Sequence, residues 1–364
     1  MNYKEILFFI AKSLTISLEE KNRYEVETIL KIKNLDWDDV VKVSTHHYVF
    51  PAIYCNLKRA SFLKFLPADL VDYMKYITDL NRDRNTLIIE QAQELNSLLL
   101  ANKITAIFLK GTGNLVAGIY EDIAERMVGD IDIVFSKEDY SKAISVLIKN
   151  GYFLVDKTPH KASYRHYPRL INENRIAAVE IHHEISVRKY NKKFNYNFVK
   201  KDSQFIRGFT VLSYANKLNL SIIANQINDN GFIYNSMALR NAYDVFLLSK
   251  KTNAKDAVNK LNELSNPLNG FLAACFQIFN SVESLQYNKT KKAASYLSIF
   301  NNQFFNHIHT KKQSKSNNIF ILIKKIFFIL FKSITHVEYR DFLFECLTNK
   351  NWYNHKLIQF GIKK

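Results

Sequence analysis

The chain has 364 residues, of which 47% are hydrophobic and 23% charged, and its formal net charge is +17 at pH 7. This length can hold two or three domains with a sizeable buried core, and the hydrophobic and charged fractions are those of an ordinary globular protein. Nine glycines and five prolines are few, which argues against a loop-rich or β-sandwich fold and favours a helix-rich one.

The cysteine content bears on the cellular compartment. Cys55, Cys275 and Cys346 are far apart and odd in number, so they match neither a disulfide framework nor a zinc cluster, and we expect a cytoplasmic location. The short apolar stretch at residues 6–11 follows Glu5 and has no small-residue cleavage site, so no signal peptide is expected.

The excess positive charge has two explanations. It favours polyanionic partners, such as nucleic acid or a phosphate-rich substrate. A chain rich in Lys, Asn, Ile and Tyr also fits an AT-rich genome, in which lysine accumulates without a function. The basic residues are spread along the chain without a dense run, so the charge alone does not choose between the two.

The first hundred residues are predicted to be helical. Apolar residues recur at three- and four-residue spacings over 70–80 and 87–100, which is the spacing of an amphipathic helix. The polar residues 81–85 between them are either a solvated face of one helix or a break between two. Residues 104–109 then form a short apolar run with β-branched residues, which predicts a buried strand.

The middle of the chain alternates strands with helices. After the strand, Gly111 and Gly113 predict a turn, and a helix is expected to begin at Asn114. We then expect a strand at 130–135, an amphipathic helix at 137–150 closed by Gly151, a strand at 152–155, and a hairpin of 163–171 with 175–185. From about residue 200 the pattern is helical again, for example at 212–227, 236–250 and 254–264.

The C-terminal region contains the most apolar segment of the chain. Residues 311–318 are polar and predict a loop, and residues 319–332 follow as the apolar segment. A transmembrane helix needs about twenty apolar residues, whereas Lys324 and Lys325 interrupt this segment near its middle. We therefore predict a core helix and no transmembrane segment. The alternative is a basic amphipathic helix in contact with a membrane surface.

Two aspartates on one predicted strand suggest a metal site. Asp130 and Asp132 are two residues apart, so their side chains lie on the same face of the strand. Two carboxylates this close repel each other unless a cation lies between them, and Mg²⁺ or Mn²⁺ shared with substrate phosphates is the natural occupant. A lone Asp-x-Asp is more often a cap and a solvated carboxylate, but the glycine turn upstream favours the metal site.

A family resemblance rests on these residues. Lys110, Gly111 and Thr112, then Arg126, then the two aspartates resemble the nucleotidyltransferase superfamily with a DNA-polymerase-β-like core. The pattern is most similar to an uncharacterised bacterial branch of that superfamily. Tyr120 fills the tyrosine position of the branch, and its third carboxylate in a later strand is matched by Glu180 with His182 two residues on.

The resemblance extends beyond the core motif, with one departure from it. Asp36, Trp37 and residues 47–51 look like the N-terminal helices of the family, and Leu239, Arg240 and Asp244 look like its later helical segment. Thr112 stands where the superfamily usually has Gly or Ser. It keeps a hydroxyl, but its β-branch is a tighter fit beside a phosphate.

The resemblance implies a role for each core residue. Asp130, Asp132 and Glu180 would hold the metal ions and carry catalysis, with Glu180 also helping to deprotonate the acceptor. The triphosphate would be bound by Lys110, Gly111, Thr112 and Arg126. Simpler alternatives exist: Gly111 can end a strand, Arg126 and Glu180 can be surface residues, and His182 can be a buried histidine rather than a base or ligand.

Together these features predict an α+β fold, with a small mixed β-sheet nucleotidyltransferase core flanked by helical regions. The expected boundaries are 1–100 for the N-terminal helices, 101–200 for the core and 201–364 for the C-terminal helices. The expected activity is metal-dependent transfer of NMP from an NTP to a hydroxyl acceptor, which could be a sugar or polysaccharide precursor, a peptide or RNA. The alternative is a catalytically silent nucleotide- or RNA-binding module with the same fold.

Overall fold

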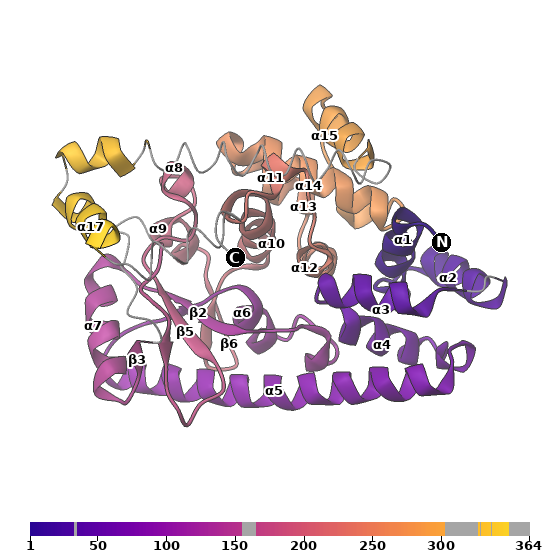
Figure 1. Ribbon diagram of the computed structural model, residues 1–364, viewed down its shortest axis with the longest axis horizontal. Helices are drawn as coiled ribbons and strands as arrows, with labels where there is room; N and C mark the ends of the chain where they lie inside the picture. The colour runs from indigo at the N-terminus through magenta and orange to yellow at the C-terminus, as the bar shows by residue number, and fades with distance from the viewer. Residues whose placement is uncertain (33–34, 155–164, 303–326, 328, 336, 349–364) are drawn as a thin grey trace.

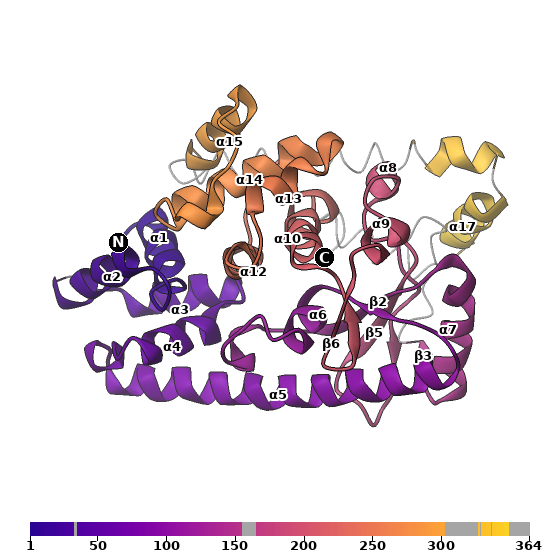
Figure 2. The same cartoon turned by 180° about the vertical axis from the view of Figure 1, so that it is seen from behind.

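The structure is a computed structural model, and it describes residues 1–32, 35–154, 165–302, 327, 329–335 and 337–348. One long helix, α5 (Ala68–Ala101), runs along one side of the molecule (Figure 1). The N-terminal helices lie over one end of α5 and a β-sheet lies over the other. The later helices cover the opposite side, as the view from behind also shows (Figure 2). The predicted α+β class, with a small mixed sheet flanked by helices, is confirmed.

The N-terminal region is helical, as predicted. Its elements are α1 (Tyr3–Ser13), α2 (Glu20–Ile32), α3 (Trp37–His46), α4 (Phe50–Arg59) and the 3-10 turn η1 (Leu63–Phe65). Local caps begin two of these helices: Asn2 and Glu5 form a capping box at α1, and Asp36 caps α3. Helix α4 packs against α5 and joins this region to the rest of the molecule.

Helix α5 settles the question left open at residues 81–85. The helix is continuous through them, and Asn81 and Asn85 are buried. The side-chain amides of both residues donate hydrogen bonds to the backbone oxygen of Arg126, and each also bonds to one further carbonyl, of Ala124 or Ile123. The buried asparagines therefore hold the loop that leads into the second strand, instead of forming a solvated face.

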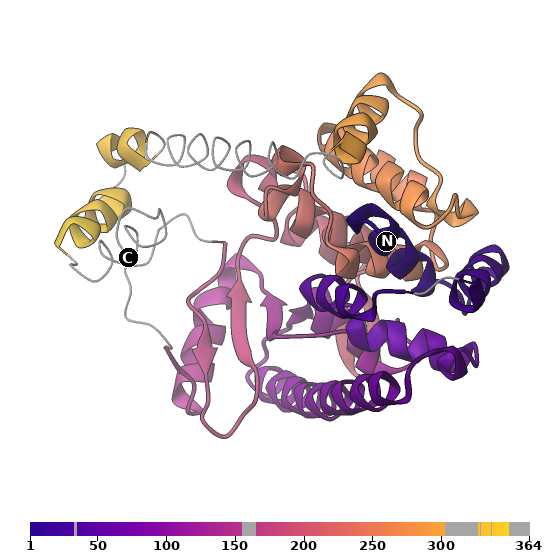
Figure 3. The same ribbon diagram turned by 45° about the vertical axis from the view of Figure 1, so that its right-hand side comes forward.

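The sheet has seven strands in the order β3-β4-β5-β2-β1-β7-β6. The strands are β1 (Ile107–Phe108), β2 (Asp130–Val134), β3 (Phe153–Leu154), β4 (Leu170–Ile171), β5 (Ala178–His182), β6 (Gln204–Ile206) and β7 (Phe209–Val211). Strands β2 and β5 are parallel neighbours near its centre (Figure 3). The predicted hairpin is confirmed in shorter form, because β4 pairs antiparallel with β5.

Two strands correct the expectation that the chain is helical from about residue 200. Strands β6 and β7 form an antiparallel hairpin, and β7 pairs parallel with β1. Arg207 and Gly208 connect them, both with positive φ, as a two-residue hairpin turn requires. Arginine is rare at such a position, so the sequence carried only half of the usual turn signal.

The helix after β1 begins earlier than predicted. Helix α6 (Lys110–Val116) starts at Lys110, so Gly111 and Gly113 lie inside it and not in a turn before it. The change of direction falls at Lys110, whose φ is positive (48°). Further along, helix α7 (Lys137–Lys149) agrees with the predicted helix at 137–150.

The remaining helices lie mostly on the side of the molecule opposite α5 (Figure 1). They are α8 (Arg188–Asn191), α9 (Tyr196–Lys200), α10 (Tyr214–Ile223), a π-helical turn η3 (Ala224–Asn228), α11 (Gly231–Tyr234), α12 (Leu239–Ser249), α13 (Ala254–Asn259), α14 (Ser265–Ile278), α15 (Lys291–Asn302) and α17 (Val337–Thr348). The 3-10 turns are η2 (Ile123–Glu125), η4 (Asn262–Leu264) and η5 (Glu283–Leu285).

The predicted loop at 311–318 and most of the apolar segment at 319–332 lie outside the described residues. Within the described part of the chain, no helix is both long enough and apolar enough to span a membrane. The described cysteines, Cys55 and Cys275, are buried and unbridged.

Candidate active site

The register of two parallel strands positions the site. Asp132 on β2 lies directly opposite Glu180 on β5, and the flanking Ile131 and Ile133 are fully buried on the other face. This pairing makes the two strands neighbours and places Glu180 beside the aspartates. Strand β1 runs antiparallel along the other edge of β2, and the backbone N–H of Leu109 donates to the oxygen of Asp132. That bond fixes the start of α6 next to the carboxylate.

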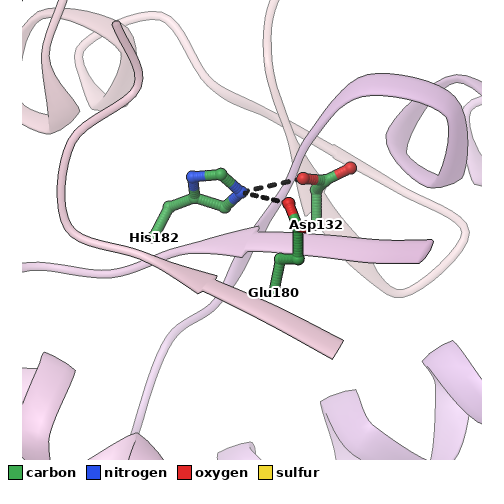
Figure 4. Close-up of side chains that lie close together, drawn as sticks. All are labelled: Asp132, Glu180 and His182. Atoms are coloured by element: carbon green, nitrogen blue, oxygen red, sulfur yellow. Dashed lines mark hydrogen bonds and ion pairs between the residues drawn. The ribbon is translucent and has the colours of Figure 1, made fainter. Parts of the chain in front are cut away.

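Asp132, Glu180 and His182 form a compact group of possible metal ligands. One ligand atom from each lies within 4.8 Å of the others. The imidazole of His182 points at the two carboxylates, with its Nε2 2.8 Å from Oδ1 of Asp132 and 3.5 Å from Oε2 of Glu180 (Figure 4). All three side chains are buried.

Lys110 provides the positive charge at this group. Its ammonium lies 2.5 Å from Oδ1 of Asp132 and 3.7 Å from Oε2 of Glu180. Burial alone would lower the pKa of Lys110, but the two carboxylates outweigh it and raise that pKa. A lysine at the first residue of α6 therefore occupies part of the space between carboxylates where a divalent cation would lie.

Asp130 lies at the open edge of the group and has a different partner. Arg169 donates from Nη2 to Oδ2 of Asp130 at 2.9 Å and from Nε to Oε1 of Glu180 at 2.8 Å. One guanidinium thus bridges two of the three carboxylates that the sequence analysis selected. The sequence motif does not include Arg169, and the only signal for it was its place in 163–171, the predicted hairpin partner of the Glu180 strand. In the structure it directly precedes β4.

The carboxylates differ in their affinity for protons. Burial, and next the charge of Glu180, raise the pKa of Asp130. Burial also favours the protonated form of Glu180, yet its pKa is lowered, because it accepts from His182 and Arg169 and lies near Lys110. Glu180 is therefore held ionised, as a metal ligand must be.

The residues fit a divalent cation through their oxygen atoms first. Asp132 and Glu180 offer carboxylate oxygens, the ligands preferred by Mg²⁺, and Asp130 adds another on the same strand face. The second nitrogen of His182, Nδ1, is buried and has no hydrogen-bond partner among the described residues. A ligating histidine usually donates from its other nitrogen, so this imidazole is better placed to donate from Nε2 to Asp132.

The motif residues of α6 pack closely against the sheet. A Cβ at Gly113 would lie 2.5 Å from the carbonyl oxygen of Phe108, and one at Gly111 would lie 2.8 Å from a methyl group of Val128. Thr112 is fully buried and donates its hydroxyl to the carbonyl oxygen of Asp130. Within the described structure, the contacts of these three residues hold α6, which begins at Lys110, against β1 and the segment that leads into β2 with its aspartates.

Arg126 lies in a buried network behind the carboxylates. Its Nε lies 3.0 Å from Oδ1 of Asp244, and its Nη1 donates to the carbonyl oxygen of Met127. Tyr120 donates to the same carboxylate at 2.7 Å. Three residues singled out by the family resemblance, Tyr120, Arg126 and Asp244, are thus brought together.

The comparisons with known proteins agree with this geometry. The family described as "Uncharacterised nucleotidyltransferase" matches residues 33–282. The chain belongs to this family. The match spans the described structure from the end of α2 to the loop before η5, and so includes all the site residues named above.

Other comparisons add little. No curated protein matches the chain. Among solved structures, the crystal structure of JHP933 from Helicobacter pylori aligns with 66% of this chain and 97% of that chain, at 15% sequence identity and a TM-score of 0.29.

Proposed function

We propose that this protein is a metal-dependent nucleotidyltransferase that moves NMP from an NTP to a hydroxyl acceptor. The observation that carries the proposal is the placement of Asp132 opposite Glu180 on parallel strands, with Asp130 on the same face and Lys110 beside them. Family membership supports nucleotidyl transfer. The metal, the NTP and the acceptor are parts of the proposal.

In this proposal each carboxylate has a defined task. Asp132 and Glu180 would hold Mg²⁺ or Mn²⁺, with Asp130 completing the site. The bound metal would neutralise triphosphate charge and orient the attacking and leaving oxygens. The acceptor oxygen would form a bond to the α-phosphorus while the bond to the pyrophosphate oxygen breaks, and pyrophosphate would leave.

The proton of the acceptor hydroxyl would pass to Glu180. As the site stands, Glu180 is a weak base, because His182, Lys110 and Arg169 lower its pKa. Its basicity would rise when Lys110 and Arg169 move to the phosphates of the substrate. The same two cations would thus bind the nucleotide and tune the base.

The phosphate-binding roles differ among the motif residues. Lys110 is partly exposed and next to the carboxylates, so we propose that it contacts the triphosphate. Gly111 and Thr112 would act by placing the first turn of α6, because their side-chain positions are buried. Arg126 already forms an ion pair with Asp244 and a hydrogen bond with the carbonyl oxygen of Met127. We therefore propose that it positions the loop before β2 instead of contacting phosphate.

The acceptor in this proposal is a sugar or polysaccharide precursor, a peptide or RNA. We also propose a cytoplasmic location for the protein, and region boundaries at residues 100 and 200. The deciding experiment incubates the protein with each α-labelled NTP, Mg²⁺ and a cell extract, and asks which size fraction gains label. The metal-chelated reaction and Asp132→Asn serve as controls. Label transfer that persists in both controls would contradict the proposal, and salt-sensitive RNA binding without turnover would favour a silent binding module.

A further inference from the structure

Two arginines, Arg165 and Arg240, have buried donors without acceptors in the described part of the structure. Nη1 of Arg165 and Nε of Arg240 are buried, and neither has a hydrogen-bond partner within the described residues. Arg126 and Arg169, by contrast, each form short ion pairs with carboxylates. Buried polar groups are nearly always hydrogen-bonded in folded proteins, so unpartnered donors point to an absent acceptor.

The two arginines come from separate elements, and both interact electrostatically with Asp229. Arg165 lies just beyond the ends of β5, where its carbonyl oxygen accepts from the backbone N–H groups of His183 and Glu184. Arg240 lies in the first turn of α12, with its guanidinium 4.9 Å from the ring centre of Tyr48. No short sequence motif links residues 165 and 240, so the sequence alone does not indicate that they act together.

Their charges act on the same surroundings. The carboxylate of Asp229, just after η3, interacts electrostatically with Lys110, Arg165 and Arg240. Arg165 also interacts with Asp132 and Glu180. Three cations, from α6, the β5 side and α12, therefore act on one carboxylate, and two of them, Lys110 and Arg165, also act on the candidate metal ligands.

Asp229 does not neutralise the two arginines through a direct ion pair. Among the described residues, Asp229 forms no ion pair within 4.0 Å with any of the three cations. Burial lowers the pKa of both Arg165 and Arg240, which means that their charged forms lack full compensation. An arriving polyanion would gain unused donors and relieve repulsion among the cations.

We propose that Arg165 and Arg240, together with Lys110, bind the polyphosphate of the incoming nucleotide. This inference deepens the proposed function and rests on it. Guanidinium groups offer several donors in a fixed plane and suit phosphate oxygens. With a metal to neutralise Asp132, Lys110 would leave this carboxylate and contact a phosphate oxygen. Arg165 and Arg240 would bind phosphate without first breaking an ion pair.

The test measures binding of inorganic tripolyphosphate with Mg²⁺ by calorimetry, because this probe needs no assumption about the base. Arg165→Gln and Arg240→Gln should each weaken binding about ten- to a hundred-fold, the effect of losing a charge-assisted hydrogen bond. Arg175→Gln is the matched control, because Arg175 is an exposed arginine paired with Glu94. It should leave the affinity unchanged.

A second variant has the opposite sign and guards against misfolding. Asp229→Asn removes the negative charge that the three cations share, so it should tighten tripolyphosphate binding several-fold. A general loss of structure cannot produce tighter binding. The thermal midpoint of each arginine variant without ligand should equal or exceed that of the wild type, because an uncompensated cation has been removed.

The outcomes separate the inference from the proposed function. Unchanged affinity in both arginine variants, or no binding of tripolyphosphate to the wild type, overturns the inference. If the wild type also transfers label from an NTP, the proposed function stands without it. If the arginine variants lose binding but no NTP yields pyrophosphate with any extract, the polyphosphate site stands and the transferase activity fails.

Discussion

At the scale of single residues, Asp132 is the centre of the site. Lys110 and His182 both reach the same oxygen, Oδ1, so the metal-free protein already neutralises this carboxylate. The repulsion expected between adjacent carboxylates is thus resolved by a lysine from α6 and by Arg169, which directly precedes β4. In the proposed function, a metal bound at Asp132 would therefore replace one cation by another, and would not fill an uncompensated site.

The exchange makes a prediction for Asp132→Asn. Without metal, the variant should lose about 1.5–3 kcal/mol of unfolding free energy, because a charge-assisted hydrogen bond to Lys110 becomes a weaker one. With Mg²⁺ or Mn²⁺, it should lack the rise in thermal midpoint that a bound ion gives the wild type, and nucleotide transfer should stop. Asp83→Asn on the exposed side of α5 is the control. A metal-induced shift of wild-type size in Asp132→Asn would remove Asp132 from the site.

Lys217 predicts a pH-dependent stability. It is buried in α10 and donates to the carbonyl oxygen of Gly113, and burial lowers its pKa to about 7. Since an unfolded lysine has a pKa of about 10.4, the unfolded state holds a proton that the folded state has released between these values. The Lys217 contribution to the unfolding free energy therefore rises with pH from about 7 to about 10, by at most about 1.4 kcal/mol per pH unit.

Denaturant titrations of the wild type and Lys217→Met between pH 6 and 9 measure this contribution as a difference. Below pH 7 the charged lysine carries its full desolvation cost. The unfolding free energy of the variant, relative to that of the wild type, should therefore be highest there. The wild type should gain on the variant as the pH rises. A difference that is independent of pH would mean that Lys217 keeps its proton in the folded protein.

At the scale of elements, the glycines of α6 fix how closely this helix approaches the sheet. Gly113 faces the carbonyl group of Phe108 at a distance that excludes a side chain. The ammonium group of Lys217 donates to the carbonyl oxygen of Gly113. Because Lys110 begins the same helix, any displacement of α6 moves the ammonium relative to Asp132. The glycines therefore act on the site through packing.

This packing can be tested with Gly113→Ala. Its Cβ would lie 2.5 Å from backbone, and backbone cannot rotate away as a side chain can. Overpacking of this kind costs about 1–3 kcal/mol, so we expect a lower thermal midpoint and weaker nucleotide transfer. Gly129→Ala, where the added methyl would meet nothing within 4 Å, should have little effect. Equal midpoints for the two variants would show that α6 can shift without cost.

The sequence predicted the elements whose signals are local. The strand at 130–135 and the helix at 137–150 follow from alternation and from helical spacing. The register that places Glu180 opposite Asp132 depends on how β2 and β5 pair, and neither segment predicts it alone. The β6–β7 hairpin was missed because Arg207 is an unusual turn residue. Arg165, Arg169 and Arg240 were missed because their relation to the carboxylates exists only after distant segments pack together.

At the scale of the whole molecule, buried polar contacts join the helical regions to the core. Glu125 accepts from Arg59 of α4 and from Tyr243 of α12, so it links the N-terminal and C-terminal helices. One residue on, Arg126 pairs with Asp244 in the same α12. The loop before β2 is therefore fixed from both sides, and the geometry of the site depends on helices far away in the sequence.

The Arg126–Asp244 pair gives the prediction at this scale. Both side chains are buried, so breaking the pair leaves an uncompensated charge, which costs about 3–5 kcal/mol. Arg126→Met and Asp244→Leu should each destabilise the protein by this amount in urea titrations. The double variant should recover much of the loss, because it buries no lone charge, although Tyr120 loses its acceptor.

A transfer assay on the double variant then separates the two roles considered for Arg126. Activity that returns with stability means that the arginine positions the loop before β2. Restored stability with a nucleotide affinity still ten- to a hundred-fold weaker would mean that Arg126 leaves Asp244 and binds phosphate during the reaction.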